Sequence, residues 1–502
     1  MDDSKPPKPP VDPGCLPAWN VAEMPEPPVM RRSLLQWIGP GIVMAGAATG
    51  TGEWVMGPQA AARYQGALLW VVLVSILCQV VLNTEAMRYA LCTGEPVMTG
   101  FMRCKPGPRF WIPFYILLDF GSWWPAVAGL AAQVLVVAIQ GLGPRDPIDP
   151  DLVRYVSYGV FLACGFLVLF GGKVYNTLEV VLSGKVLFVV FYMLICTVFF
   201  VSFQTWVRIW SGLFDVTRVV RDASGGDGID WALIAALAGY SGVGGLGNIM
   251  VSNFVREKGW GMGQYVGAIP SAFGGHEIRL SHLGTICPSG EKTRRRFRGW
   301  WRRVLADQYG IWLVGSLFGM MLPCVLGAEY LRVEEIGKDH WRWAAKLAQD
   351  FGAAHGDLFR LLTLICGLVI LIPGQYGIVD GVARRWCDTV WSGLAFVRKF
   401  DTDKVKYLYY AFAAAYLIWG VSAYTFFPQL SGSQMMQIAG NMANLAIAAT
   451  IFHTLYVNRR FLPKEVQPSL GKQVLMVIAG LFFLTMFGLV VNDKIVPLLR
   501  GG

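Results

Sequence analysis

The sequence predicts an all-α integral membrane protein with about eleven transmembrane helices, built as an inverted repeat of five plus five helices with discontinuous helices 1 and 6. Three observations predict this fold. Of the 502 residues, 54% are hydrophobic and 15% are charged, which is too apolar for a soluble globule of this size. Eleven apolar runs of roughly 20 residues can each cross a bilayer. Two of these runs, five apart in order, carry the same kind of interruption.

The predicted spans divide the chain into five parts. We expect a disordered tail at 1–33, because it is rich in proline and acid, then a first repeat at 34–203 and an outer loop at 204–230. A second repeat follows at 231–457, with a long cytoplasmic loop at 256–303, and an additional helix with the C-terminus occupies 458–502. The spans lie near 36–62, 67–91, 110–140, 152–171, 176–203, 231–255, 304–327, 358–383, 405–427, 433–457 and 472–493.

The positive charges follow one side of the membrane. Alternating the loops between two sides places most basic clusters on one face, which is cytoplasmic by the positive-inside rule. The N-terminus is then cytoplasmic and the C-terminus extracytoplasmic, in an inner or plasma membrane. The net charge of +10 is explained in this way, so we expect membrane lipids and no nucleic acid as partners. The oligomeric state stays open. The clusters are Arg31 with Arg32, Arg103 with Lys105 and Arg109, Lys173, the run at 292–303, Arg384 with Arg385, Arg398 with Lys399, and Arg459 with Arg460.

The first interrupted span is IGPGIVMAGAATGTGEWVMGPQAAARYQG at 38–66. Its centre mixes glycine and threonine with an acid, although glycine lowers helix propensity by about 1 kcal/mol and a carboxylate at membrane depth is costly. Both features make sense if the helix is broken and its free peptide groups and one carboxylate hold a substrate. The alternative is a continuous glycine-rich helix that ends in the headgroup layer. The candidate binding residues are Thr49, Gly50, Thr51, Gly52 and Glu53.

The sixth span repeats this pattern in WALIAALAGYSGVGGLGNIMVSNFVREKG. Its glycine-rich centre supplies the candidate residues Gly245, Leu246, Gly247 and Asn248. Glycines in a membrane helix are also common where two helices pack closely. The two interruptions stand at matching positions of the two predicted repeats, with a carboxylate in one and an amide in the other, which favours a single binding site near the midplane, shared by both broken helices.

Two stretches resemble a known family. The run GPGIVMAGAATGTGEW, followed by PQAAARYQGALLW, resembles the first two helices of the Nramp family of proton-coupled divalent-metal transporters. YNTLEVVLSGKVLFVVF at 175–191 is similar to that family's fifth helix. The resemblance implies a LeuT-type inverted repeat and metal-ion transport by alternating access, as a proton-coupled symporter.

The departures from the family change the expected substrate. Gly50, Thr51, Gly52 and Glu53 stand where the family has Asp-Pro-Gly-Asn, and Leu246, Gly247 and Asn248 stand where it has Met-Pro-His. The thioether ligand is therefore missing, and an oxygen-rich site suits Mg²⁺, Ca²⁺ or Mn²⁺ better than soft metals. We expect a hard divalent ion as substrate, protons as the coupling ion and no cofactor.

Three further charged groups lie inside predicted spans. Asp119 is a candidate proton carrier, because burial disfavours the charged form of a carboxyl group; it could instead be a structural partner of Ser122. Lys185, on the fifth span, could approach the first-span break and act as the protonation switch, by resemblance to proton-coupled LeuT-type transporters. Glu179 is the nearest carboxylate on that helix, although a partner from another helix fits better. The alternative for Lys185 is that it extends to the headgroups.

Other polar residues could line the path or tie helices together. Glu85 and Arg88 are three residues apart and are expected to pair on one helix face as a clamp or gate. Four more residues could line a permeation path or form hydrogen bonds between helices. These are Gln375, Asp380, Gln437 and Asn441, with Gln434 and Asn444 beside the last two.

Other functions fit less well. An amino-acid or other small organic solute carrier of the same fold would use the positive helix ends at the breaks. A membrane-embedded enzyme acting on lipids would need convergent acids or histidines, and the sequence has no P-loop, no HExxH and no plausible Ser/His/Asp set. We therefore expect no enzyme, while a non-transporting sensor stays open. The group His276, Glu277, His282 and Cys287 fits no standard zinc spacing.

Overall fold

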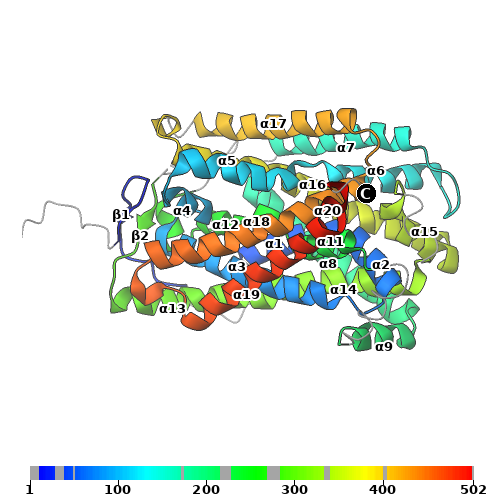
Figure 1. Ribbon diagram of the computed structural model, residues 1–502, viewed down its shortest axis with the longest axis horizontal. Coiled ribbons are helices and arrows are strands. Elements are labelled where there is room, and N and C mark those ends of the chain that lie inside the picture. The colour runs from blue at the N-terminus through cyan, green and yellow to red at the C-terminus, as the bar shows by residue number, and fades with distance from the viewer. Residues whose placement is uncertain are drawn as a thin grey trace, which may run out of the picture.

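The computed structural model describes residues 11–28, 39–48, 51–170, 174–214, 228–267, 283–332, 340–399 and 404–499. Within these ranges, some side chains also lie outside the description: those of Val43, Ala47, Ala48, Thr51, Glu53, Leu169, Phe170, 174–182, Leu498 and Leu499. The described chain is almost entirely helical, and most long helices run roughly along one axis (Figure 1). The described strands, β1 (Asn20–Val21) and β2 (Thr285–Ile286), pair in parallel near one end.

The first half of the chain begins with the short helices α1 (Pro40–Ala48) and α2 (Thr51–Tyr64). The next elements are α3 (Trp70–Thr93), α4 (Val97–Arg103), α5 (Pro108–Asp119), the 3-10 turn η2 (Phe120–Trp123), α6 (Ala126–Gln140), α7 (Pro150–Phe170), α8 (Val174–Phe200) and α9 (Phe203–Gly212).

The second half contains one helix that is far longer than a bilayer crossing, α16 (Asp357–Gly393). The other elements are α11 (Trp231–Tyr240), η3 (Gly245–Met250), α12 (Val251–Glu257), η4 (Gly261–Tyr265), α13 (Glu291–Leu305), the π-helical turn η5 (Ala306–Trp312), α14 (Leu313–Tyr330), α15 (Trp343–His355), η7 (Val397–Lys399), α17 (Val405–Phe426), α18 (Gly432–Phe461), η9 (Lys464–Val466), α19 (Leu470–Val490), η10 (Val491–Ile495) and α20 (Val496–Leu499).

Nine stretches of the described residues are long and apolar enough to cross a membrane, and each matches a predicted span. The two remaining predictions have separate explanations. The span at 36–62 includes residues outside the described ranges. The span at 405–427 is present as the 22-residue helix α17, whose many tyrosines lower its mean hydropathy. The chain is therefore a multi-pass, helical membrane protein.

The sixth span is interrupted as the sequence predicts. Helix α11 ends at Tyr240, and the chain resumes as η3 at Gly245. Gly244 and Gly245 have φ angles of 80° and 53°, a left-handed conformation that glycine adopts at little steric cost. In the first span, α1 ends at Ala48 and α2 begins at Thr51, while Thr49 and Gly50 lie outside the described residues.

The N-terminal segment corrects one prediction. We expected residues 1–33 to be disordered, but Leu16, Trp19 and Met24 in the described part are buried. Arg103 of α4 lies 3.8 Å from the Trp19 ring centroid and donates a hydrogen bond to the Pro17 carbonyl at 2.8 Å. Composition alone predicts disorder, because the segment has few apolar residues. The structure differs because these residues pack against the helical body rather than against one another.

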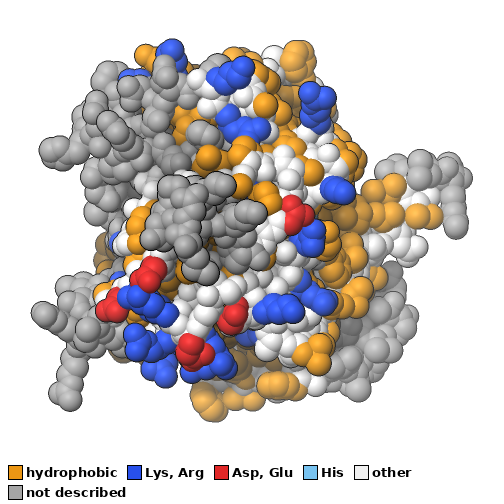
Figure 2. Space-filling view, turned by 90° about the vertical axis from the view of Figure 1, so that its left-hand side faces the viewer, with side chains coloured by type: hydrophobic (Ala, Val, Ile, Leu, Met, Phe, Trp, Pro, Cys, Tyr) orange, Lys and Arg blue, Asp and Glu red, His pale blue; other side chains and the backbone are white. Residues whose placement is uncertain are grey.

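The end of the molecule that carries β1, β2 and α13 is called the basic end below. Lysine and arginine side chains are spread over this face, with fewer acidic ones among them (Figure 2). Several arginines that we assigned to this surface are nevertheless buried. Arg103, Arg384 and Arg385 are each at most 3% exposed, because each pairs with a carboxylate.

Candidate functional site

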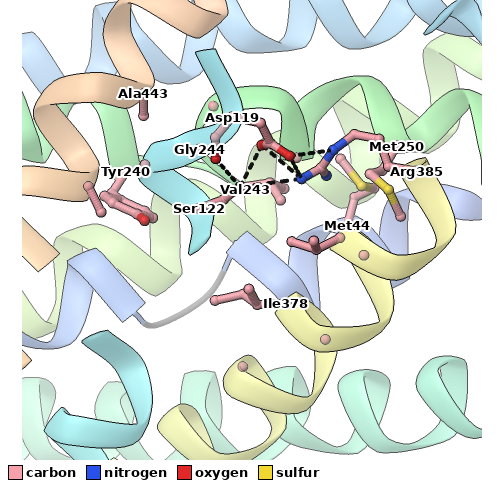
Figure 3. Close-up of a pocket in the computed structure, with 18 of the residues that line it drawn as sticks. Met44, Asp119, Ser122, Tyr240, Val243, Gly244, Met250, Ile378, Arg385 and Ala443 are labelled. Atoms are coloured by element: carbon pink, nitrogen blue, oxygen red, sulfur yellow. Dashed lines mark hydrogen bonds and ion pairs between the residues drawn. The ribbon is translucent and has the colours of Figure 1, made fainter. Parts of the chain in front are cut away.

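A cavity of about 80 Å³ lies where the interrupted sixth span meets α1, η2, α16 and α18 (Figure 3). Tyr240 and Val243 line it from the sixth span, and Met44 lines it from α1. Ala443 of α18 closes another side. The cavity is therefore enclosed by segments from both predicted repeats.

Glycines leave this cavity open on two sides. Gly244, Gly245 and Gly247 face it from the interrupted span, while Gly374, Gly377 and Gly381 face it from α16. A Cβ atom added at Gly377 would meet no atom within 4 Å. Peptide groups near the interruption have left the regular helical hydrogen-bond pattern, so a bound solute can reach them.

The first and sixth spans touch each other. A Cβ atom added at Gly52, near the start of α2, would lie 2.6 Å from the Tyr240 Cβ and 3.4 Å from its carbonyl oxygen. Tyr240 is the last residue of α11 and lines the cavity. The predicted residue Glu53 follows Gly52 directly, so its backbone lies beside the junction of the two spans. Its side chain lies outside the described part of the chain.

Asp119 lines the cavity as half of a buried ion pair. Its carboxylate accepts hydrogen bonds from Arg385 Nη2 at 2.6 and 2.8 Å (Figure 3). It also accepts one from Trp386 Nε1 at 2.7 Å. Ser122 Oγ donates a further one. These donors occupy both oxygens of the carboxylate. The geometry therefore favours the structural interpretation of Asp119 over that of a proton carrier.

The remaining sixth-span candidates have different surroundings. Leu246 and Asn248 are fully buried and do not line the cavity. Asn248 Nδ2 instead donates a hydrogen bond to Gln79 Oε1 of α3 at 2.8 Å. Of the four predicted residues in this span, Gly245 and Gly247 thus face the cavity.

Glu85 and Arg88 pair as the sequence predicts. The guanidinium donates two hydrogen bonds to the carboxylate, at 2.7 and 3.0 Å. Asn458 Nδ2 of α18 also donates to Glu85 Oε2, and Arg88 lies 4.0 Å from the Trp301 ring centroid. The pair therefore joins α3 to α18 and α13 rather than stabilising one helix alone.

Lys185 is buried on α8, with 2% of its surface exposed. This helix packs against α1, α14 and α16. The side chain of Glu179, on the same helix, lies outside the described residues. The predicted approach of Lys185 to the first-span interruption therefore stays a prediction.

Most of the predicted path residues form hydrogen bonds between helices, and one of them lines a cavity. Gln375 accepts from the Ala128 backbone N–H, Asp380 pairs with Arg384, and Asn441 donates to the Ala232 carbonyl. The Asp380–Arg384 pair lies within α16, but Asp380 also accepts a hydrogen bond from Tyr409 Oη of α17 at 2.7 Å. Gln375, Asp380 and Asn441 thus each hold neighbouring helices together, which was the alternative interpretation. Gln437 lies elsewhere, in a second cavity of about 90 Å³, lined also by Gln59, Arg63, Asp230, His340 and Gln434.

Two functional candidates were missed by the sequence reasoning. Arg385 was assigned to the basic surface, although it forms part of the cavity wall. Asp307 was not considered, although it is a fully buried acid in the seventh span. An acid and an arginine inside apolar helical stretches were the available signals. Among the described residues, no group of three or more His, Cys, Asp or Glu side chains could hold a metal ion.

The arrangement of the helices matches solved transporter structures. A mutant of the manganese transporter of Eremococcus coleocola superposes with a TM-score of 0.64 at 13% identity, covering 95% of this chain and 91% of that one. The fold is that of the LeuT-type transporters. The same transporter in complex with an aromatic bis-isothiourea compound gives a TM-score of 0.63 at 13% identity, with 97% and 92% covered.

Sequence comparisons add no family to this result. No protein-family model matches the chain, and a search of curated proteins finds no match. A likeness at 13% identity establishes the fold alone, so membership of the Nramp family stays a prediction.

Proposed function

We propose that the protein is a secondary active transporter that moves a small solute across the membrane by alternating access. The observation that carries this proposal is the cavity where α1 of the first span meets the interrupted sixth span. Half-helices that meet at such a cavity can move separately, so that the site opens to one side and then to the other. Gly52 against Tyr240 supports a common junction for both spans.

The substrate that we propose is a hard divalent cation, similar to Mg²⁺ or Mn²⁺. Helices α1 and α11 both end near the cavity, and the C-terminal end of a helix carries partial negative charge. Glu53 would add a full negative charge at the same junction. Carboxylate and carbonyl oxygens suit Mg²⁺ and Mn²⁺. The structural likeness to a manganese transporter supports the same class of substrate.

A small organic solute is the second candidate. The described cavity wall is mostly apolar, and its carboxylate, Asp119, is already neutralised by Arg385. Apolar walls with a few fixed polar groups are typical of sites for organic ligands. In this case Glu53 would be dispensable.

Uptake by liposomes that contain the purified protein distinguishes the candidates. We expect Mg²⁺ and Mn²⁺ to enter when an inward proton gradient is imposed, and Glu53→Gln to abolish that uptake. Glu291→Gln, which removes an exposed acid of α13, is the matched control and should leave uptake unchanged. Better uptake of Cd²⁺ than of Mg²⁺ would contradict a hard-ion site. Uptake of an amino acid but of no divalent ion would favour the organic solute.

Coupling to protons has its own test. If Lys185 is the protonation switch, Lys185→Met should keep downhill Mn²⁺ uptake while losing its stimulation by the proton gradient. Stimulation equal to that of the unmodified protein would remove Lys185 from this role.

A further inference from the structure

Asp307 is a buried carboxylate at the start of the seventh span. It lies on η5, the π-helical turn that joins α13 to α14, and none of its surface is exposed. Its Oδ2 accepts hydrogen bonds from the Gly41 backbone N–H at 2.7 Å and from Gln308 Nε2 at 2.9 Å. Its Oδ1 is buried and has no side-chain donor among the described residues, while the Gly39 backbone N–H also interacts with the carboxylate. Turns of π-helix are rare and occur frequently at functional sites.

The first turn of α1 is shaped around this carboxylate. A Cβ atom added at Gly41 would lie 2.7 Å from Asp307 Oδ2, and one added at Gly39 would lie 2.7 Å from Oδ1. The Gly-Pro-Gly sequence therefore leaves the space in which the carboxylate sits. The N-terminal end of a helix carries partial positive charge, so α1 stabilises the ionised form.

Burial of Asp307 opposes its ionisation. Charge inside a membrane protein is costly unless it is paired, and Oδ1 of Asp307 has no side-chain donor among the described residues. Arg303 of α13 interacts electrostatically with it. On α3, the nearby residue is the neutral Asn83, whose amide donates a hydrogen bond to Gln308. Helix α1 contains no charged residue. On α14 the first charge is Glu329, and Lys472 of α19 reaches the tyrosine of η5 instead.

We propose that Asp307 is a proton-binding site that controls the docking of α1 against the seventh span. The ionised carboxylate caps α1 and holds it on η5. A proton bound at Oδ1 removes the charge that attracts the amides of α1, so the cap weakens and α1 can separate. Because α1 contributes Met44 to the cavity wall, this separation would open the cavity toward the basic end. The last step rests on the proposed transport function.

Hydrogen–deuterium exchange tests the docking without any substrate. The purified protein in lipid nanodiscs is labelled at about pH 5 and about pH 8, and the exchange of peptides covering 39–48 is corrected for the intrinsic effect of pH. We expect about tenfold faster exchange at the lower pH, the factor that corresponds to losing about 1.4 kcal/mol when a charge-assisted hydrogen bond becomes a neutral one. Asp307→Asn should exchange rapidly at both pH values.

Two controls make the result decisive. Glu291→Gln removes an exposed acid from α13, the helix that precedes η5, and should keep the pH dependence of the unmodified protein. Gly41→Ala keeps the acid but displaces it, so it should also exchange rapidly at both pH values, which covers the case in which Asp307→Asn does not fold. Equal exchange at both pH values in the unmodified protein, or an unchanged pH dependence in Asp307→Asn, would overturn the proposal.

A transport measurement separates this proposal from the proposed function. With Mn²⁺ as the probe, Asp307→Asn should lose stimulation of uptake by the proton gradient. If the unmodified protein moves no Mn²⁺ but its exchange depends on pH through Asp307, the metal substrate is wrong and the proton site stands. If Mn²⁺ enters and Asp307→Asn keeps full stimulation, the proton site is wrong and transport stands.

Discussion

Replacing Arg385 by methionine should destabilise the protein by about 3–5 kcal/mol, the usual cost of removing one partner of a buried ion pair. Arg385 donates to Asp119 through Nε at 3.2 Å and through Nη2 at 2.6 and 2.8 Å. Without it, Asp119 keeps Trp386 and Ser122 as donors but loses the positive charge that balances it. The carboxylate is 1% exposed, so water cannot replace the guanidinium without rearrangement of the wall.

Thermal melting in detergent, followed by tryptophan fluorescence, measures this effect in a double-mutant cycle. Asp119→Asn alone leaves Arg385 without its partner and should also destabilise. The double variant Asp119→Asn with Arg385→Met should be more stable than either single variant, since no unpaired charge remains. Arg360→Met is the control, because its pair with Asp357 is exposed and should contribute less than about 1 kcal/mol. Additive losses in the cycle would refute the ion-pair argument.

Two further predictions concern other contacts. Gly52→Val should destabilise the protein by about 1–3 kcal/mol, because its Cβ would overlap that of Tyr240; unchanged thermal melting would contradict the contact between the first and sixth spans. Arg103→Gln should cost about 3–5 kcal/mol by leaving Glu95 buried and unpaired. Burial raises the pKa of Glu95, but the charge and hydrogen bonds of Arg103 outweigh it, so the pKa is lowered. The pair's contribution is therefore present above the unfolded-state pKa and is lost as pH falls through the lowered folded-state pKa; melting of the unmodified protein, but not of Arg103→Gln, should show this loss at acid pH.

The fold could be predicted because its signals are local. Apolar runs of the length of a bilayer and the glycine cluster at 242–247 are visible in single stretches of sequence, and the structure has the corresponding helices and interruption. The Glu85–Arg88 pair was predictable for the same reason, since the two residues are one helical turn apart. These features do not depend on how distant parts of the chain meet.

The site was only partly predictable because its contacts are not local. Asp119 and Arg385 are 266 residues apart, so the sequence did not indicate that they neutralise each other. Asp307 meets Gly41 across the same number of residues. The N-terminal segment shows the same limit. Its proline-rich composition predicts disorder, but Trp19 packs against the distant Arg103. Tertiary contacts decided each case.

Filling the cavity is the most direct measurement of the central claim. Gly377 faces the cavity, and a side chain there would meet open space, so Gly377→Phe should occlude the site with little strain. Gly488→Phe, at an exposed and equally open position on α19, is the matched control. In liposomes, we expect Mn²⁺ uptake to be lost in Gly377→Phe and kept in Gly488→Phe. Undiminished uptake by a folded Gly377→Phe variant would contradict the assignment of this cavity as the transport site.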